Sequence, residues 1–410
     1  MNVEQVRALA SPDGQALLRS LPPYDESAVF TLQASLRATG VPADLVAAAL
    51  TQQRLRARAR AKFGEFADDM LFTSDGLEQA TRIEVATVHA ARFASLSLAT
   101  VHDLGCGIGA DAITMSVLGV TVSAIDADPV TAAVADTNLR PWPESRARVG
   151  LVEDFVPPAD AMRDRIGAWL DPARRVAGVA DAAGRARRLH RLEDLSPSWS
   201  TVQAIAAAVP ATGAKLAPSF PHAALPPGAE AQWVSWEGDV VECSLWWGPL
   251  ARRPGRTALL LGARRPSTLV EDTGDDAEAA RSLADLGEWF HEADRAVVQA
   301  GLLGGVAARL GGLEVDPGTG YLTTHDAVTL PETKRYAVRA AFPFHAKSLR
   351  GWLRDRGITG LTIKKRAGRI DDAALRRQLR IGAGAGDGEQ ATIVLTRVAG
   401  DGVVLVVDPA

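Results

Sequence analysis

The spacing of apolar positions changes twice along this chain. Over residues 1–62, apolar side chains recur at three- and four-residue steps, most clearly in 28–40 and 43–63, with Gly and Pro between these runs. This spacing gathers the apolar side chains on one face of a helix, so we expect a helical N-terminal region. The basic residues that end the second run fit a solvated helix face.

Residues 63–265 alternate short apolar runs with helical stretches. This alternation predicts an α/β domain with a mainly parallel sheet and helices on both faces. The last three apolar runs follow one another closely, which favours antiparallel neighbours at one edge. The candidate strands are 100–105, 120–126, 149–154, 165–171, 212–218, 231–236, 241–247 and 256–262.

Residues 264–285 are polar and acidic, and we interpret them as a connection between domains. Residues 286–410 then mix helical and strand patterns, which predicts a separate α+β domain. Its candidate helices are 294–312, 346–357 and 372–380, and its candidate strands are 335–342, 360–366, 391–398 and 402–408.

The composition narrows the class of protein. With 410 residues, 47% of them hydrophobic, the chain can bury the cores of two or three domains and is not disordered. The two cysteines, Cys106 and Cys243, lack the spacing of a disulfide or zinc scaffold, and free thiols fit a cytoplasmic location. We expect no signal peptide, no membrane span and no metal site, because the chain lacks a basic leader, a long apolar run and paired histidines.

A glycine-rich loop directly follows the first candidate strand. Gly105, Gly107 and Gly109 allow a sharp turn and a close approach of backbone to a ligand, and a helix start follows them. The loop therefore suits a nucleotide-like cofactor that lies across the strand ends. A dinucleotide motif would have glycine at Ala110, although alanine can replace it. A nicotinamide-binding fold, or a glycine turn without a ligand, remains an alternative.

Acidic residues stand at the ends of three successive candidate strands. Asp103 precedes the glycines, Asp126 ends the next run about twenty residues on, where an acid can accept both ribose hydroxyls, and Asp154 ends the third. The pattern D-x-G-x-G-x-G resembles motif I of class I S-adenosylmethionine-dependent methyltransferases. The resemblance implies a Rossmann-like sheet, with the cofactor's ammonium near the first acid and its adenine near the third. The implied cofactor-binding residues here are Asp103, Gly105, Cys106, Gly107, Asp126 and Asp154.

The segment 70–82 lies just before the first strand. Thr73 or Ser74, followed by Glu78, has the pattern of a capped helix start. The position also resembles the segment that covers the cofactor in trimethylguanosine synthase-like RNA methyltransferases. That resemblance implies cofactor contacts from Phe72, Thr73 and Gln79.

Residues 171–174 follow the fourth candidate strand and resemble the Asp/Asn-Pro-Pro-aromatic motif of amine methyltransferases. In that motif the acid or amide accepts hydrogens of the target amine, which raises its nucleophilicity and aligns it for transfer. Asp171 and Pro172 match, whereas Ala173 and Arg174 replace the second proline and the aromatic residue. Arg174 could pair with a phosphate or stack on a base, and Trp199 is an alternative stacking platform.

The order of these motifs, with the C-terminal pattern, resembles the bacterial, largely actinobacterial, class I methyltransferase-like proteins that carry a C-terminal THUMP-like domain. The resemblance covers the chain from about residue 60 to its end. THUMP domains bind tRNA, so it implies RNA as a partner. Residues 350–380 hold ten Lys and Arg against three Asp, which fits a phosphate-binding surface or an ordinary Arg-rich helix face. The tightest cluster is Lys364, Lys365, Arg366 and Arg369.

The sequence thus predicts three domains: a helical region at 1–62, a Rossmann-like class I methyltransferase domain at 63–265 and a THUMP-like α+β domain at 286–410. The expected activity is S-adenosylmethionine-dependent methylation of RNA, either tRNA or rRNA, at a base nitrogen. One alternative is a small-molecule or protein substrate. Another is a catalytically impaired module that binds only cofactor and RNA, since Ala173 and Arg174 depart from the amine-methyltransferase motif.

Overall fold

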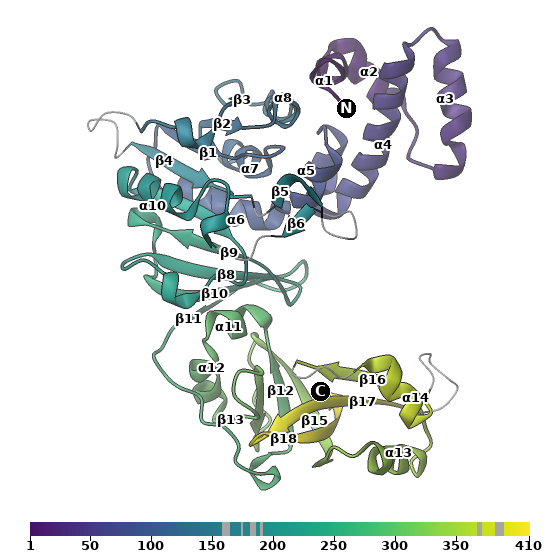
Figure 1. Ribbon diagram of the computed structural model, residues 1–410, viewed down its shortest axis with the longest axis vertical. Coiled ribbons are helices and arrows are strands. Elements are labelled where there is room, and N and C mark those ends of the chain that lie inside the picture. The colour runs from purple at the N-terminus through teal and green to yellow at the C-terminus, as the bar shows by residue number, and fades with distance from the viewer. Residues whose placement is uncertain (158–164, 174, 181–185, 189–191, 367–370, 382–388) are drawn as a thin grey trace. The chain divides into compact units, whose positions relative to one another are not determined.

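The computed structural model describes residues 1–157, 165–173, 175–180, 186–188, 192–366, 371–381 and 389–410 (Figure 1). The chain forms two compact units. The first contains Met1–Leu216 and Ser244–Arg252, and the second contains Ala217–Cys243 and Arg253–Ala410.

The first unit is built on five parallel strands in the order β7-β4-β1-β2-β3. Its strands are β1 (Thr100–Leu104), β2 (Val122–Asp126), β3 (Arg146–Val149), β4 (Ile166–Leu170), β7 (Ala211–Leu216) and the separate hairpin pair β5 (Arg175–Ala180) and β6 (Ala186–Arg188). The strand order reverses beside β1, and in sheets of this kind ligands bind at the carboxyl ends of the strands next to that reversal. The Rossmann-like fold that the sequence predicts is confirmed.

Helices precede and connect these strands, and their succession matches the apolar spacing of the sequence. They are α1 (Val3–Ala10), α2 (Pro12–Ser20), α3 (Val29–Ala38), α4 (Ala43–Phe63), α5 (Ser74–Gln79), α6 (Ile83–Ala94), α7 (Ala110–Val117), α8 (Pro129–Asn138) and α10 (Trp199–Ala208). Short 3-10 turns are η1 (Glu26–Ala28), η2 (Gly64–Asp68), η3 (Val152–Asp154), η4 (Leu192–Asp194) and η6 (Gly248–Leu250).

Two hydrophobic clusters cover the two faces of this sheet, because side chains alternate along each strand. Val101 and Trp169 belong to the cluster that also contains buried residues of α4, α6, α7 and α8. Leu104 and Leu170, from the same two strands, belong to the cluster that contains buried residues of α10. Both faces are therefore covered, which explains why the central strand β4 is wholly apolar and buried.

The second unit contains the remaining strands. These are β8 (Glu230–Trp236), β10 (Gly255–Leu261), β11 (Thr268–Glu271), β12 (Trp289–Ala293), β13 (Leu313–Glu314), β14 (Tyr321–Thr324), β15 (Thr333–Pro343), β16 (Ile358–Lys365), β17 (Glu389–Val398) and β18 (Asp401–Pro409). The strand β9 (Asp239–Trp246) begins in this unit, and its last residues belong to the first. The helices are α11 (Arg295–Ala300), α12 (Leu303–Leu310), α13 (Ala346–Arg354) and α14 (Asp372–Leu379), and the 3-10 turns are η5 (His222–Ala224) and η7 (Leu283–Asp285).

Seven strands of this unit form a sheet in the order β13-β14-β12-β15-β18-β17-β16. Most neighbours are antiparallel, whereas β16 and β17 are parallel. The helices α13 and α14 bury Leu349, Leu353, Leu375 and Leu379 in one cluster with β16, β17 and β18. The C-terminal chain is therefore an α+β structure, as its sequence predicts.

Three details of the sequence-based prediction are wrong. The third strand is β3, so residues 149–154 include only its last position, because Gly150 ends the pairing with β2 and a 3-10 turn follows. The strands β8 and β10 pair in parallel, not antiparallel. The stretch 264–285 contains the short strand β11, whose four residues all pair antiparallel with β10 and are surrounded by polar residues in the sequence. No helix in the described part of the chain is long and apolar enough to cross a membrane.

The packing around Gly213 in β7 gives a testable prediction. A Cβ on this residue would lie 2.6 Å from Cζ3 of Trp246 and 2.8 Å from Cε3 of Trp169. We expect Gly213→Ala to lower the free energy of unfolding by about 1–3 kcal/mol, because these stacked rings must shift. Urea titration followed by tryptophan fluorescence measures the change.

Gly351 is the matched control. It lies inside α13, with no atom within 4 Å of the position of a Cβ. Gly351→Ala should stabilise its helix by about 0.5–1 kcal/mol, since alanine loses less backbone entropy on folding. Destabilisation by both variants, or by neither, would contradict the packing described for β7.

Candidate active site

The glycine loop turns sharply between β1 and α7. Gly105, Gly107 and Gly109 have φ angles of +90°, +57° and +88°, a region that other residues avoid. The N–H groups of Gly105 and Cys106 both donate to the carbonyl oxygen of Ile125 in β2, each at 2.9 Å. The loop is therefore fixed to the neighbouring strand. No atom lies within 4 Å of the position that a Cβ of Gly107 would take, so the backbone is accessible there.

Asp103, near the end of β1, has a buried carboxylate that is only 1% exposed. Neither of its oxygens has a hydrogen-bond partner among the described residues. Burial first, and then the charges of Asp111 and Asp171, raise the pKa of Asp103 well above its ordinary value. A buried, unpartnered carboxylate costs free energy, so this group is suited to receive a cationic ligand group.

Asp126 is the last residue of β2. Its carboxylate accepts hydrogen bonds from the N–H of Gly107 at 3.0 Å and from the N–H of Asp128 at 2.9 Å. Burial raises its pKa, although these two hydrogen bonds act in the opposite direction. The acid at the end of the second strand therefore touches the glycine loop itself.

Asp171 follows β4 and forms an ion pair with Lys215 of β7. The ammonium group of Lys215 also donates to the hydroxyl of Thr81 at 3.0 Å. The carbonyl oxygen of Asp171 lies 3.5 Å from the position of a Cβ on Gly105. The residue expected to meet the target amine thus stands against the loop expected to meet the cofactor. Pro172 beside it is buried.

A second buried ion pair lies beside the first. Asp111 of α7 contacts Nδ1 of His89 in α6 at 2.7 Å, and Thr81 also bonds to this carboxylate. Burial alone would raise the pKa of Asp111, but the charge and hydrogen bond of His89 hold it below its ordinary value. The His89 ring packs against that of Trp169, with centroids 4.4 Å apart.

The segment before α5 is anchored next to the glycine loop. Asn138 of α8 bonds both the N–H and the carbonyl of Leu71, and it also donates to the carbonyl of Ile108 at 3.0 Å. Gln52 of α4 bonds the N–H and the carbonyl of Phe72 in the same way. The helical N-terminal region therefore helps to position the backbone beside the loop.

The three residues predicted from this segment differ in their surroundings. Phe72 is fully buried and its ring packs 5.6 Å from that of Phe63. Thr73 caps α5, accepting the N–H of Gly76 at 3.0 Å, and a Cβ on Gly76 would lie only 2.3 Å from the side chain of Ile108. Gln79 is exposed at the end of α5.

Other predicted residues lie farther from these contacts or are not described. Asp154 is exposed and ends η3. Trp199 begins α10, half-buried, with its ring 6.4 Å from that of Trp247. Cys106 is buried within the loop, and burial raises the pKa of its thiol well above the ordinary value, which makes it a poor nucleophile. Arg174 lies outside the described residues.

The basic cluster of the C-terminal unit is largely ion-paired. Lys364 contacts Glu292 at 2.7 Å, and Lys365 contacts Asp372 at 2.6 Å. Arg366 lies 3.5 Å from Glu292 and donates to the backbone carbonyl of Ala293 at 2.6 Å. Arg369, the fourth member of the cluster, lies outside the described residues.

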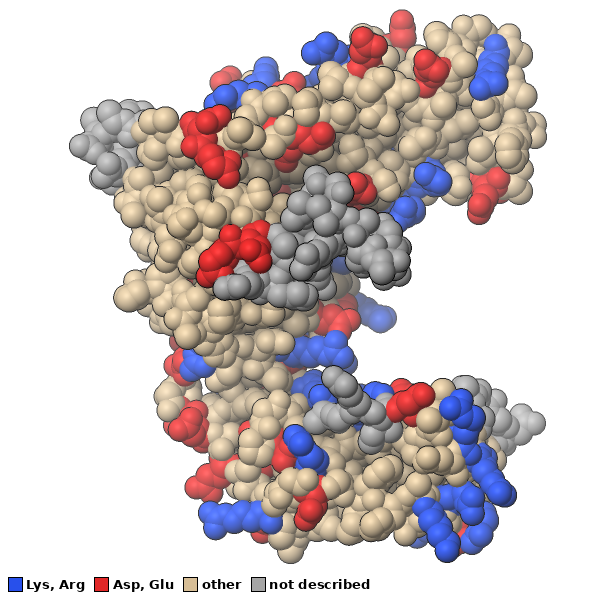
Figure 2. All heavy atoms as spheres, in the orientation of Figure 1, with Lys and Arg blue, Asp and Glu red and all other residues tan. Residues whose placement is uncertain are grey.

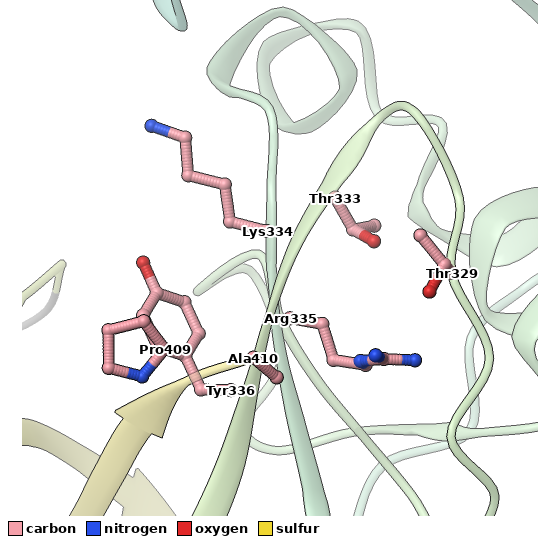
Figure 3. Close-up of a pocket in the computed structure, with 7 residues that line it drawn as sticks. All are labelled: Thr329, Thr333, Lys334, Arg335, Tyr336, Pro409 and Ala410. Carbon is pink, nitrogen blue, oxygen red and sulfur yellow. The ribbon is translucent and has the colours of Figure 1, made fainter.

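A pocket of about 410 Å³ lies in the same unit, at the start of β15 and the end of β18 (Figure 3). It is lined by Thr329, Thr333, Lys334, Arg335, Tyr336, Pro409 and Ala410. The guanidinium of Arg335 lies over the ring of Trp289, 4.7 Å from its centroid, so this side chain of the pocket lining also packs within the domain. In the described ranges no group of three His, Cys, Asp or Glu is placed to hold a metal ion.

Sequence reasoning missed Lys215, Thr81, His89 and Asp111, which the structure places around the predicted acids. The signal for Lys215 was its position in an otherwise small and apolar strand, since lysine is rarely buried without a partner. Asp111 follows the glycines by two residues, so its position was also informative.

Comparison with known proteins identifies the family. The chain is 31% identical over 342 residues to a curated protein of Mycobacterium tuberculosis named "uncharacterized S-adenosylmethionine-dependent methyltransferase", a match that covers 80% of this chain and 87% of that protein. The chain belongs to this methyltransferase family. The methyltransferase is an enzyme whose cofactor is S-adenosylmethionine.

Two further comparisons concern the domains of the methyltransferase. Residues 333–409 match the family model described as THUMP domain-like, and residues 2–59 match one described as Domain of unknown function (DUF8688). A solved structure, that of a putative methyltransferase from Porphyromonas gingivalis W83, is similar with a TM-score of 0.71 at 18% identity. That similarity covers 95% of this chain and 100% of that chain, and it confirms the fold.

The residues described above fit this cofactor. The ammonium of a methionine group can pair with the unpartnered carboxylate of Asp103, and the accessible backbone at Gly107 leaves room for a ligand. Helix α7 begins directly after Gly109 without a side-chain cap, so its first N–H groups suit a carboxylate.

The burial of Asp103 predicts an unusual effect of pH on stability. Because its folded-state pKa is raised, the folded methyltransferase binds this proton more tightly than the unfolded chain does. Stability contributed by the protonated acid is therefore lost as pH rises above the ordinary value of 3.8. Asp103→Asn should stabilise the protein without cofactor, by an amount that grows between pH 5 and pH 7.5, at most about 1.4 kcal/mol per pH unit.

Asp111→Asn is the matched control, because the folded-state pKa of Asp111 is lowered instead. This variant loses the contact with His89 and should be destabilised, most strongly at the higher pH. Urea unfolding at both pH values distinguishes the two cases. An equal shift of Asp103→Asn at pH 5 and pH 7.5 would count against a raised pKa.

Proposed function

We propose that this enzyme transfers the methyl group of S-adenosylmethionine to a base nitrogen of RNA, either tRNA or rRNA. The observation that carries the proposal is the pairing of a methyltransferase fold with a THUMP domain-like region, 333–409, whose helices present exposed basic side chains. The two buried cysteines, both free thiols, support a cytoplasmic location for the reaction.

The proposed cofactor site combines the strand-end acids with the loop. Asp103 pairs with the ammonium, Asp126 accepts the ribose hydroxyls and Asp154 accepts the adenine amino group. The backbone of Gly105, Cys106 and Gly107 lies along the cofactor, and Phe72, Thr73 and Gln79 cover its methionine end. When bound, S-adenosylmethionine supplies an electrophilic methyl group on a sulfonium. For Asp126, exchange of its bonds to backbone N–H groups for ribose hydroxyls is feasible because it is only partly buried.

The proposed acceptor site is Asp171 with Pro172, and Arg174 is proposed to contact the base or a phosphate. The carboxylate of Asp171 accepts a hydrogen from the target amine and orients its lone pair. No further general base is required, because a base nitrogen with an accessible lone pair loses its proton after transfer. The contact of the Asp171 backbone with Gly105 supports this placement.

The proposed RNA surface extends beyond the predicted cluster. Three residues of the predicted cluster already have acidic partners: Lys364, Lys365 and Arg366. These partners reduce their electrostatic attraction for phosphates. Exposed cations cover α13 and α14 and the ends of these helices (Figure 2). Lys347, Arg356, Arg377 and Arg380 are exposed, and Arg350 and Arg376 are half-buried. The proposal therefore assigns binding of the RNA backbone mainly to these helices, together with Arg369 of the predicted cluster.

One observation favours a second candidate, a module that binds cofactor and RNA without turnover. Ala173 and the residue after it depart from the amine-methyltransferase motif, and Asp171 is engaged by Lys215. Transfer of tritium from labelled S-adenosylmethionine to purified tRNA and rRNA decides between the two. Transfer to a small molecule or protein fraction instead would replace RNA as the substrate.

The cofactor site gives a prediction for affinity. Asp126→Ala should weaken S-adenosylmethionine binding by about 1.5–3 kcal/mol, or roughly ten- to a hundredfold, because a charged hydrogen-bond acceptor is lost. Calorimetric titration measures this change. Asp128→Ala is the control, since Asp128 caps α8 through the N–H of Thr131 and should leave the affinity within about threefold. Unchanged affinity in Asp126→Ala would exclude the proposed ribose contact.

The RNA surface gives a second prediction. The double variant Arg376→Glu/Arg377→Glu should lower the affinity for tRNA at least about tenfold and reduce the slope of log affinity against log salt by about two. Filter binding at several salt concentrations measures both quantities. Arg54→Glu/Arg58→Glu, on the exposed side of α4, makes the same change in net charge. An equal loss in that control would show that net charge, not the surface of α14, determines binding.

A further inference from the structure

Lys215 stands opposite the proposed acceptor residue across two parallel strands. The register of β4 and β7 pairs Trp169 with Gly213 and Leu170 with Ala214. The next position brings Asp171 beside Lys215, and the two side chains form an ion pair. The sheet itself therefore fixes this contact, because both backbones are held by the strand hydrogen bonds that precede it.

The position of Lys215 is unfavourable for a lysine without a special role. All six residues of β7 are buried, and the Lys215 side chain is 9% exposed. Removal of an ammonium from water is costly unless acidic and hydroxyl partners replace the water. The Asp171 carboxylate and the Thr81 hydroxyl are such partners. The side chain spans from the sheet interior to the group that is proposed to meet the target amine.

Two further carboxylates lie near Asp171. The charges of Asp103 in β1 and Asp126 in β2 interact with it, and the ammonium of Lys215 in β7 forms an ion pair with it. Like charges disfavour an ionised carboxylate, whereas an adjacent ammonium favours it. Lys215 also acts on Asp103 and Asp111, so its ammonium lies within reach of the whole acidic group.

We propose that Lys215 is a positioning residue for methyl transfer: its buried ammonium holds the Asp171 carboxylate in place and in its ionised form. The inference rests on the proposed function of Asp171. Lys215 acts through that carboxylate and takes no proton in the reaction. Asp171, fixed in this way, presents an acceptor to the incoming amine without a search among side-chain rotamers.

The first experiment compares Lys215→Met, which keeps length but removes charge, with Lys215→Arg, which keeps the charge. Single-turnover transfer of labelled methyl to pooled tRNA and rRNA is followed from pH 5 to pH 9 at saturating S-adenosylmethionine. In Lys215→Met the pH of half-maximal rate should rise by about one to three units, because Asp171 loses the charge that favours ionisation. In Lys215→Arg it should stay within half a unit. A uniform loss of rate at every pH, without this shift, would overturn the inference.

The second experiment does not depend on transfer. Urea midpoints of Lys215→Met, Asp171→Asn and the double variant form a cycle that measures the coupling between the two side chains. The double variant should be more stable than the sum of the single shifts predicts, since Asp171→Asn removes the charge whose ion pair with Lys215 is already lost in Lys215→Met. Additive shifts would overturn the inference, whereas coupling supports it.

These experiments separate the inference from the proposed function. If the wild-type enzyme transfers no methyl group to either RNA pool, the RNA proposal fails, and the cycle alone then decides whether Lys215 holds Asp171. If the wild-type enzyme is active and Lys215→Met keeps the wild-type pH profile, the inference fails while the RNA proposal stands.

Discussion

The burial of several carboxylates at one edge of a sheet is the constraint on which the proposed active site depends. Parallel strands all end at the same edge, so acids placed at their ends are forced together. Asp103, Asp126 and Asp171 meet there, and the pKa of the first two is raised by burial. Lys215 neutralises part of this charge through its ion pair with Asp171. In the proposed site, a cofactor that carries two cationic groups and one anionic group would supply the rest, so that an acidic site that is costly when empty becomes selective.

The sequence predicted the position of candidate site residues best where those residues are neighbours along the chain. The glycine loop, Asp103 and Asp126 could be predicted because a turn, a strand end and an acid follow one another directly along the chain. The pairing of Lys215 with Asp171 could not, since the two residues are close only across the sheet. The end of β3 was misplaced for a related reason: apolar residues continue through 149–154, although hydrogen bonding to β2 stops at its beginning. The spacing of apolar residues indicates which side chains are buried. It does not show where hydrogen bonding to a neighbouring strand ends.

Local charge counts had a similar limit in the C-terminal unit. Ten basic residues against three acidic ones in 350–380 predicted a cationic surface. The tightest cluster nevertheless contacts Glu292, a residue of β12 far away in sequence, and so two of its cations serve the packing of the sheet. The helices of the same stretch keep Lys347 and Arg377 exposed, because their buried faces are occupied by leucines. The cations that are free to bind a phosphate therefore cannot be identified from charge counts alone. Their availability depends on contacts with residues distant in sequence.

The hold of α4 on the segment before α5 has a consequence for how this protein can evolve. Gln52 and Arg56 hydrogen-bond the backbone of Met70 and Phe72, in the segment that is anchored next to the glycine loop. A gene rearrangement that detached the N-terminal helices would leave these backbone groups buried without partners. Residues 2–59, although matched by a family model of their own, are thus expected to be inherited together with the catalytic sheet. Their recombination onto an unrelated methyltransferase would need a matching segment to receive them.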